Sequence, residues 1–370
     1  MDLPIRDNVL AMQPYSPGKP ITEVKRELGL NEVIKLASNE NPLGPSPRAV
    51  AVIQQAAGEL HRYPDAASYD LLQAIAKKFE LDPTEVIVGN GSDELIHVLG
   101  QIFLGRPDDE VIVGQPSFVR YDAAAHLAGS KLIQVPNNKD MGLDLEAMAA
   151  KISPKTKLIF LANPNNPTGT YFNRAQFRGF LAHVPKTALV VLDEAYYEYA
   201  RAEEDLPVST DFFRQHPNVF GLRTFSKAYG LAGIRLGFGI GSPEVIDAMN
   251  RAREPFNVNL LAQLGGIAAL EDEDHLSITL RHNREGMQRM LDQARELGIQ
   301  AVPSAANFVY YRLGQPAEPI FQALLRAGII VRVGPSMGAD DAMRVSVGTP
   351  GEVDQFLRAF EQVITEGRSE

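Results

Sequence analysis

The sequence predicts an α/β fold: a large domain with a mostly parallel sheet flanked by helices, plus a smaller α+β domain. Short aliphatic runs alternate with helical patterns from residue 71 to residue 240, as in parallel sheets whose crossover connections are helices. After residue 243, long helical patterns lead into strands mixed with helices. The length of 370 residues also exceeds what one compact core usually contains, so two domains are expected.

The pattern divides the chain into three parts. Residues 1–40 are polar and marked by prolines, which indicates an N-terminal arm, and we expect it to pack with the small domain. Residues 41–245 form the expected large domain, and residues 246–370 form the small one. The expected strands are residues 86–88, 111–113, 132–135, 158–162, 189–192, 219–222, 236–240, 308–311, 329–333 and 343–347. The expected helices include residues 71–79, 144–152, 174–183 and 353–364, with long helices between residues 243 and 297.

The segment EVIVGNGSDELI, residues 85–96, predicts a strand, a glycine turn and the start of a helix. Backbone N–H groups and the helix dipole at such a start bind phosphate. Ser92 is also a good N-cap residue, so simple helix capping explains the segment as well. The segment does not follow the dinucleotide pattern G-x-G-x-x-G, and the P-loop pattern G-x-x-x-x-G-K-S/T does not occur in the sequence.

Two further strands lead into polar residues. Residues 157–162 are followed by the loop NPNNPTG. Its prolines make the loop stiff, so the loop can direct Asn166 at a ring oxygen of a bound ligand. Residues 188–192 are aliphatic and end in Asp193, as in a buried parallel strand that brings an acid to the edge where ligands bind. A plain turn at Asn166, and a cap or turn at Asp193, are the alternatives. Tyr196 either donates a hydrogen bond to a ring hydroxyl of such a ligand or is an ordinary half-buried aromatic residue.

The segment TFSKAYGLAGIRLG, residues 224–237, places Lys227 in an apolar, glycine-rich turn, followed by Arg235. A lysine amine attacks carbonyls once desolvation or neighbouring positive charge lowers its pKa. An aldehyde cofactor with a phosphate needs such an amine and a fixed cation. Pyridoxal phosphate fits, because it is held as a lysine Schiff base and pairs its ring nitrogen with an acid. A surface lysine is the alternative, which the order of the other segments disfavours.

Together these segments resemble the fold-type I pyridoxal-phosphate aminotransferases, and the similarity covers nearly the whole chain. The NPNNPTG and TFSK segments are highly specific for this class. Within the class, residues 13–20 (QPYSPGKP) and 36–46 (LASNENPLGPS) are similar to those of the histidinol-phosphate aminotransferases. The resemblance continues through residues 62–65, 89–94, 331–334 and 343–349.

The resemblance implies roles for the matching residues toward the cofactor. Lys227 would bind it covalently and move the substrate proton, Asp193 would pair with its ring nitrogen, and Phe118 would stack on its ring. Asn166 and Tyr196 would hydrogen-bond the ring hydroxyl oxygen. The phosphate would be bound by Ser92, Asp93, Ser226, Arg235 and, from the neighbouring subunit of a homodimer, Tyr63.

The resemblance also implies a substrate pocket. Arg344 would bind the anionic end of the substrate, and the further substrate-binding residues would be Tyr15, Asn39 and Arg332. A guanidinium binds carboxylate or phosphate through paired hydrogen bonds, so one pocket serves both groups. The segments around the two arginines alternate in polarity, however, and a solvent-facing arginine on a half-buried strand is the alternative for both.

The implied activity is a transamination between histidinol phosphate and 2-oxoglutarate that gives imidazole acetol phosphate and glutamate, a step of histidine biosynthesis. An aromatic amino-acid aminotransferase and a pyridoxal-phosphate-dependent decarboxylase of a phosphorylated amino acid are the alternatives. A cofactor-binding regulator would carry a DNA-binding domain, which the sequence does not provide.

Composition narrows the remaining classes of function. The formal net charge of −10 disfavours nucleic acid and anionic membranes as partners. The chain has no cysteine, which excludes disulfides and thiolate catalysis, and its seven histidines form no metal-binding pattern. No signal peptide starts the sequence, and no apolar run is long enough for a transmembrane helix. We therefore expect small-molecule substrates, no metal and a cytoplasmic location.

Overall fold

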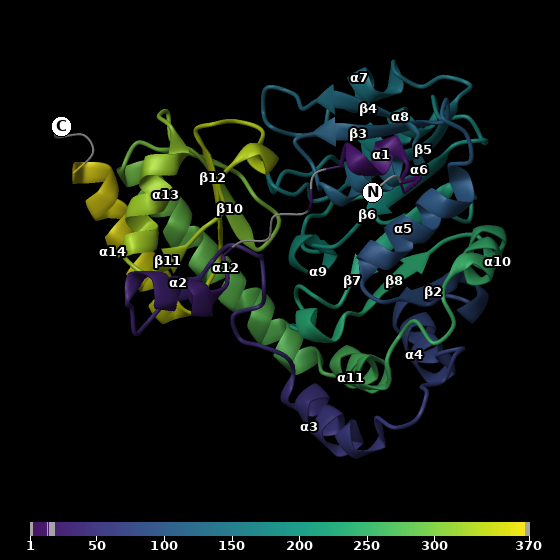
Figure 1. Ribbon diagram of the computed structural model, residues 1–370, viewed down its shortest axis with the longest axis horizontal. Coiled ribbons are helices and arrows are strands. Elements are labelled where there is room, and N and C mark those ends of the chain that lie inside the picture. Colours follow the sequence, from purple (N-terminus) through teal and green to yellow (C-terminus); the bar gives the residue numbers. More distant parts are fainter. Residues whose placement is uncertain (1–2, 13, 15–18, 367–370) are drawn as a thin grey trace.

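The computed structural model describes residues 3–12, 14 and 19–366 and has the predicted α/β fold, arranged in two lobes (Figure 1). Within these residues the central sheet contains seven strands in the order β2-β8-β7-β6-β5-β3-β4, and β8 alone runs antiparallel to its neighbours. The strands are β2 (Val86–Gly89), β3 (Glu110–Gln115), β4 (Lys131–Pro136), β5 (Thr156–Ala162), β6 (Leu189–Asp193), β7 (Val219–Thr224) and β8 (Gly237–Ile240). Each lies on a segment that the sequence predicted as a strand.

Helices cover both faces of this sheet, because successive side chains of a buried strand point to opposite faces (Figure 1). In β5, Leu158 and Phe160 face one core, and Ile159 and Leu161 face the other. The first core is closed by α5 (Ser92–Phe103), α6 (Arg120–Ala128) and α10 (Pro243–Ala252). The second is closed by α3 (Pro47–Ala56), α4 (Tyr69–Phe79), α7 (Leu145–Ala149), α8 (Arg174–Leu181) and α11 (Leu260–Leu270). The short α9 (Tyr197–Ala200) follows β6.

The smaller lobe is built on an antiparallel sheet in the order β12-β10-β9. Its strands are β9 (Gln300–Val302), β10 (Phe308–Arg312) and β12 (Ala342–Ser346), and its helices are α12 (Glu273–Glu296), α13 (Ala317–Arg326) and α14 (Pro350–Glu366). The strand predicted at residues 329–333 is divided, because β11 (Ile329–Ile330) pairs with β1 (Ile34–Lys35), whereas Arg332 pairs with Arg344. The chain changes its pairing partner at Val331, and this interrupts the ladder.

The N-terminal arm contacts both lobes. Its second helix, α2 (Ile21–Leu28), packs Val24 against Leu325 of the smaller lobe, where β1 also pairs with β11. Its first helix, α1 (Asp7–Leu10), lies against α6 of the larger lobe. There the side-chain amide of Asn8 donates a hydrogen bond to the carbonyl oxygen of His126 at 2.7 Å.

The helices that follow the large sheet join the lobes. Both α10, which packs on α5 and β2, and α11, which packs on α3 and α4, lie with the larger lobe. In α12, Leu276 belongs to the core of the larger lobe and Met290 to that of the smaller one. The predicted domain limits at residues 40 and 245 stay a prediction, and the second falls within α10.

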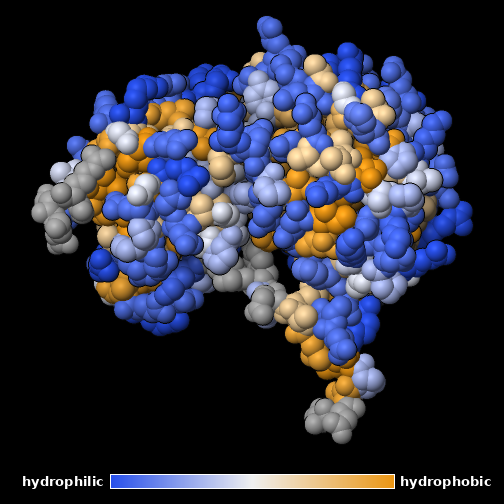
Figure 2. All heavy atoms as spheres, turned by 90° about the horizontal axis from the view of Figure 1, so that it is seen from above, coloured by the Kyte–Doolittle hydropathy of each residue, from blue (hydrophilic) through white to orange (hydrophobic). Residues whose placement is uncertain are grey.

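One face of the molecule is seen in the space-filling view, and it is mainly hydrophilic. On the face shown in Figure 2, hydrophilic side chains cover most of the molecule, and hydrophobic side chains gather in patches on both lobes. Among the described residues, no helix combines the length and the apolar character needed to cross a bilayer.

Candidate active site

The candidate site lies between the lobes, where the carboxyl ends of β5, β6 and β7 face the segment that follows β1. A cavity of about 220 Å³ is lined there by Ser92, Asp93, Phe118, Asn166, Asp193, Tyr196, Ser226, Lys227 and Arg235. An adjoining cavity of about 120 Å³ is lined by Asn39, Arg332 and Arg344, together with Phe118, Asn166 and Lys227, which it shares with the first. The tertiary structure therefore brings together most of the residues that the sequence predicted.

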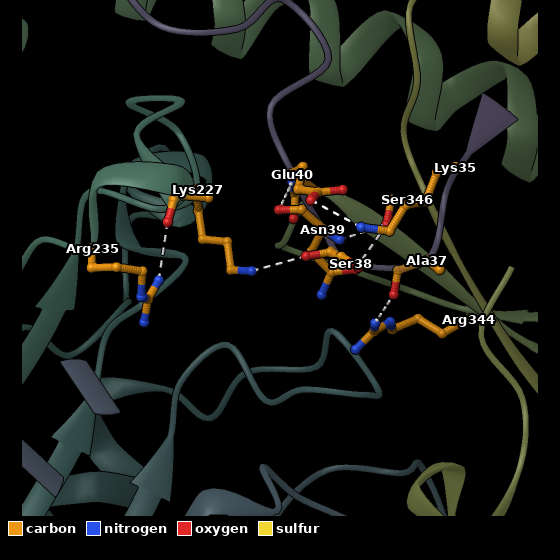
Figure 3. A network of polar contacts seen from close by, with 11 residues as sticks. Lys35, Ala37, Ser38, Asn39, Glu40, Lys227, Arg235, Arg344 and Ser346 are labelled. Carbon is orange, nitrogen blue, oxygen red and sulfur yellow. Dashed lines mark hydrogen bonds and ion pairs between the residues drawn. The ribbon is translucent and has the colours of Figure 1, made fainter. Parts of the chain in front are cut away.

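Lys227 is held in the loop that follows β7. The chain can pass here because Gly230 has a φ of +70°, and a Cβ atom at this position would lie 2.3 Å from the carbonyl oxygen of Gly44. The Lys227 amine donates a hydrogen bond to the carbonyl oxygen of Ser38 at 3.0 Å. In Figure 3, Lys227 stands between Arg235 and Arg344.

The environment of Lys227 makes its amine more nucleophilic. Burial lowers the pKa of Lys227 to about 8, and the positive charge of Arg344 acts in the same direction. The charge of Glu40, which also lines the larger cavity, opposes this shift. A substantial fraction of the amine is consequently neutral at a pH where an ordinary lysine is protonated.

Asp193 ends β6 as a buried carboxyl group with two donors inside the chain. The backbone N–H of Ala195 donates to Oδ1 at 3.0 Å, and the hydroxyl of Tyr121 donates to Oδ2 at 2.5 Å. Burial raises the pKa of Asp193 to about 6, while these two hydrogen bonds favour the charged form. Asp193 is therefore mainly ionised at neutral pH and can pair with a cationic ring nitrogen.

The opposite end of the cavity is suited to an anion. Ser92 is the first residue of α5, and Gly91 rather than Ser92 is the N-cap, so the capping interpretation of Ser92 is wrong. Arg235 lies across from this helix end, with Nη1 3.5 Å from Ser226 Oγ and Nη2 3.8 Å from Asp93 Oδ2. The backbone amides of the helix start and the guanidinium together favour phosphate.

Gly91 leaves the room that this arrangement requires. Its φ is +77°, and a Cβ atom here would lie 2.5 Å from Nη2 of Arg235. The set of groups around the cavity thus consists of an anion site, a buried carboxylate and a reactive amine. This set fits the phosphate, the ring nitrogen and the aldehyde of pyridoxal phosphate.

Polar side chains from both lobes meet between the two cavities (Figure 3). The side-chain amide of Asn39 donates to the hydroxyl of Tyr196 at 2.8 Å, and Asn39 Oδ1 accepts from Ser346 Oγ at 2.9 Å. Burial raises the pKa of Tyr196 to about 12, so its hydroxyl stays protonated. Arg344 donates through Nη1 to Asn166 Oδ1 and through Nη2 to the carbonyl oxygen of Ala37 at 2.6 Å.

For Arg344, these contacts decide between a role in anion binding and a solvent-facing position. Arg344 is 7% exposed, so the alternative of a solvent-facing arginine is wrong at this position. Arg332 is half-buried and lines the same cavity, next to Arg344 in the backbone pairing. Both cations are therefore present where an anionic substrate group would enter.

Of the remaining predicted residues, one lies elsewhere and one is not described by the structure. Tyr15 is outside the described residues. Tyr63 lines neither cavity, is 82% exposed, and stacks on Phe256 with ring centroids 4.6 Å apart. Its predicted role depends on a second subunit and stays a prediction.

Sequence reasoning missed other residues of the cavity. Tyr121 lies on α6, after the turn that carries Phe118, and no strand end or loop pattern marks it. Ser38 and Glu40 lie within residues 36–46, a segment already noted for its resemblance, so that segment was the available signal.

Comparisons with known proteins agree with this geometry. Residues 31–360 match the family "Aminotransferase class I and II". The chain is 46% identical to the histidinol-phosphate aminotransferase of Moorella thermoacetica, covering 97% of this chain and 92% of the relative. It is 44% identical to that of Symbiobacterium thermophilum, covering 98% and 99%. A crystal structure of histidinol-phosphate aminotransferase from Sinorhizobium meliloti in complex with pyridoxal-5'-phosphate has a TM-score of 0.89 at 30% identity, with 98% of each chain covered.

Proposed function

This chain belongs to the class I and II aminotransferases, and we propose that it transfers an amino group between histidinol phosphate and 2-oxoglutarate with pyridoxal phosphate as cofactor. The products are imidazole acetol phosphate and glutamate. The observation that carries the proposal is the presence, in one cavity, of a lysine amine of lowered pKa, a buried carboxylate and an anion site. The choice of substrate rests on relatives named histidinol-phosphate aminotransferases, at 42–46% identity over nearly the whole chain.

Pyridoxal phosphate, when bound, supplies an electron sink for negative charge that develops at the substrate Cα. We assign its aldehyde end to Lys227, its ring nitrogen to Asp193 and its ring face to Phe118. The ring hydroxyl is assigned to Asn166 and Tyr196. The residues assigned to the phosphate are Ser92, Asp93, Ser226 and Arg235.

The amine of Lys227 is suited to carry the substrate proton. A general base works best when its pKa lies near the operating pH, and the pKa of this amine is lowered to about 8. Its neutral form accepts the proton that leaves the substrate Cα. The Ser38 carbonyl, 3.0 Å from Nζ, limits the directions in which the amine can point.

The anionic end of the substrate is assigned to Arg344, with Arg332 and Asn39 beside it. Arg344 is already oriented by Asn166 and by the carbonyl oxygen of Ala37, so little side-chain freedom is lost when an anion binds. Histidinol phosphate offers a phosphate, and glutamate and 2-oxoglutarate offer carboxylates. A guanidinium binds all of them by donating paired hydrogen bonds to their oxygen atoms.

A homodimer is the second part of the proposal. Tyr63, between α3 and α4, stacks on Phe256, before α11, and both side chains are exposed. The same helices and segments carry three further exposed apolar side chains, which are Leu60, Tyr69 and Leu264. Exposed apolar clusters of this kind are typical of contact surfaces. We propose that this surface pairs with a second copy and that Tyr63 reaches the cofactor phosphate of the partner. The cytoplasmic location expected from the sequence is retained as a proposal.

Two measurements test the assigned chemistry. Borohydride reduction followed by peptide mapping should label Lys227, and a label on another residue would refute the assignment. A substrate panel with 2-oxoglutarate as acceptor should give higher kcat/KM for histidinol phosphate than for phenylalanine or tyrosine. A preference for the aromatic amino acids would favour the alternative aminotransferase activity.

Mixing two inactive variants tests the shared site. Tyr63→Ala and Lys227→Ala each damage a different part of the site, and hybrid dimers contain one site in which both residues are intact. Activity should therefore reappear when the two variants are dissociated together and reassociated. No recovery, despite hybrid dimers detected by mass spectrometry, would contradict a role for Tyr63 across the interface.

A further inference from the structure

The hydroxyl of Tyr121 contacts the Asp193 carboxylate, and the assigned chemistry gives Tyr121 no role. It is 0% exposed, and its hydroxyl lies 2.5 Å from Asp193 Oδ2 across 72 positions of sequence. It lines the same cavity as Asp193 and Lys227. A buried hydroxyl aimed at a buried carboxylate restricts both groups, because either one without the other would lose a hydrogen bond in a low-dielectric environment.

The ring of Tyr121 is fixed as firmly as its hydroxyl. It stacks on Phe160 of β5 with centroids 4.6 Å apart and planes inclined by 8°. The ring of Phe118, which we assign to the cofactor ring face, meets it edge-on at 5.6 Å. Tyr121 therefore connects the central sheet, the carboxylate and the stacking ring.

We propose that Tyr121 is a positioning residue that fixes the Asp193 carboxylate in orientation and in charge for the ring nitrogen of the cofactor. This inference rests on the proposed function. It adds a residue that acts through Asp193 and does not itself touch the reacting atoms.

Orientation follows from the two donors. The N–H of Ala195 occupies one acceptor position on Oδ1, and the Tyr121 hydroxyl occupies one on Oδ2. A carboxylate accepts about four hydrogen bonds, so acceptor capacity remains for a ring nitrogen. Rotation of the carboxylate about χ2 would break both existing bonds, and the carboxylate plane is therefore set before the cofactor binds.

Charge follows from the surroundings of Asp193. Burial opposes its ionisation, and the negative charges of Asp93 and Glu194 act in the same direction. The groups that favour ionisation are the hydroxyl of Tyr121 and the N–H of Ala195. Burial and the nearby Asp193 raise the pKa of Tyr121 well above its ordinary value, so Tyr121 remains a neutral donor. By stabilising the carboxylate, it makes Asp193 the weaker base and keeps the shared proton on the ring nitrogen.

The test compares two tyrosine-to-phenylalanine variants of the holoenzyme. Tyr121→Phe removes the hydroxyl and retains the ring that stacks on Phe160. The matched control is Tyr311→Phe, because Tyr311 is also 0% exposed and, within the described residues, its hydroxyl has no hydrogen-bond partner. It lies in the core of the smaller lobe, so its removal should leave the cofactor unaffected.

The main readouts are independent of turnover. In Tyr121→Phe, the cofactor dissociation constant should rise about tenfold, which corresponds to about 1.4 kcal/mol. The ¹⁵N chemical shift of labelled cofactor should move toward that of the unprotonated ring, and kcat should fall with little change in KM. Tyr311→Phe should match the wild type in all three. A dissociation constant and ¹⁵N shift in Tyr121→Phe equal to those of the wild type would overturn the proposal.

A double-mutant cycle with Asp193→Asn separates positioning from general packing. If Tyr121 acts through the Asp193 charge, Tyr121→Phe should have almost no further effect on cofactor affinity in the Asp193→Asn background. Additive effects would overturn the proposal. Replacement of Tyr121 by 3-fluorotyrosine keeps the ring and strengthens the donor, so cofactor should be retained more tightly. Unchanged or weaker retention would contradict the proposal even if Tyr121→Phe does not fold.

Borohydride labelling of the wild type distinguishes a failure of this inference from a failure of the proposed function. A label on Lys227 combined with wild-type behaviour of Tyr121→Phe rejects only the role of Tyr121. Absence of the label on Lys227 rejects the assigned cofactor chemistry and, with it, the basis of the inference.

Discussion

Replacing Arg223 by methionine should destabilise the folded protein by about 3–5 kcal/mol, the cost of leaving a buried charge without its partner. The side chains of Arg223 and Glu194 are 1% and 2% exposed, and Arg223 Nε lies 2.9 Å from Glu194 Oε2. The guanidinium carbon also lies 4.6 Å from the ring centroid of Phe79 and 3.8 Å from that of Tyr197. Methionine fills much of the same volume, so the lost charge dominates the effect.

The remaining contacts of Glu194 place the expected value near the lower end of this range. Its carboxylate also accepts from the backbone N–H of Ser209 at 2.5 Å and from Ser209 Oγ at 2.8 Å. These donors stay in the variant and compensate part of the buried charge. We therefore expect Arg223→Met to destabilise the folded protein by about 3 kcal/mol. The pair lies close to the candidate site, because Glu194 directly follows Asp193 and Arg223 lies on the strand that leads to Lys227.

Urea unfolding checks this value against a matched surface pair. Arg251 and Asp247 form an ion pair at 2.9 Å whose side chains are 78% and 63% exposed, and Arg251→Met should cost less than about 0.5 kcal/mol. The double variant Arg223→Met/Glu194→Gln should be more stable than Arg223→Met alone, because the uncompensated charge is gone. A cost for Arg223→Met no larger than that for Arg251→Met would refute the reasoning.

Three further predictions concern the site and its surroundings. Lys227→Ala should bind cofactor without a covalent link and lose about 10²–10⁴-fold in transamination, as for a missing general base; near-normal turnover would contradict its role. Arg235→Ala should weaken cofactor binding by about 1.5–3 kcal/mol, as expected for a lost charged contact; an unchanged dissociation constant by equilibrium dialysis would exclude the phosphate assignment. Burial raises the pKa of Glu198 from 4.5 to about 7, so the folded state retains a proton that the unfolded state loses, and wild-type stability falls as pH rises through this window. Glu198→Gln should reduce that fall between pH 5 and pH 8 in urea unfolding, and the part that remains comes from Asp193, whose pKa burial raises to about 6. An equal fall in the variant would disprove the cause.

Local sequence was sufficient for features whose cause is local. The aliphatic runs of β5 and β6 predicted buried strands, because both faces of such a strand are covered and no polar alternation is needed. Asp193 was predicted at the carboxyl edge of the sheet because it ends one of these runs, and Asn166 was predicted in the loop that follows the other. Their assigned roles came from the resemblance and still await the tests described above.

The sequence by itself determined the alternation of strands and helices and the residue types that follow each strand, since hydrophobic period and turn chemistry act over a few neighbouring residues. Only the tertiary structure decided that Arg344 is buried against Asn166, 178 positions away, and that the strand after Ile330 changes its pairing partner. It also decided that Tyr121 meets Asp193. Such contacts depend on how distant elements cross and on what each burial excludes from water, and no local pattern encodes either.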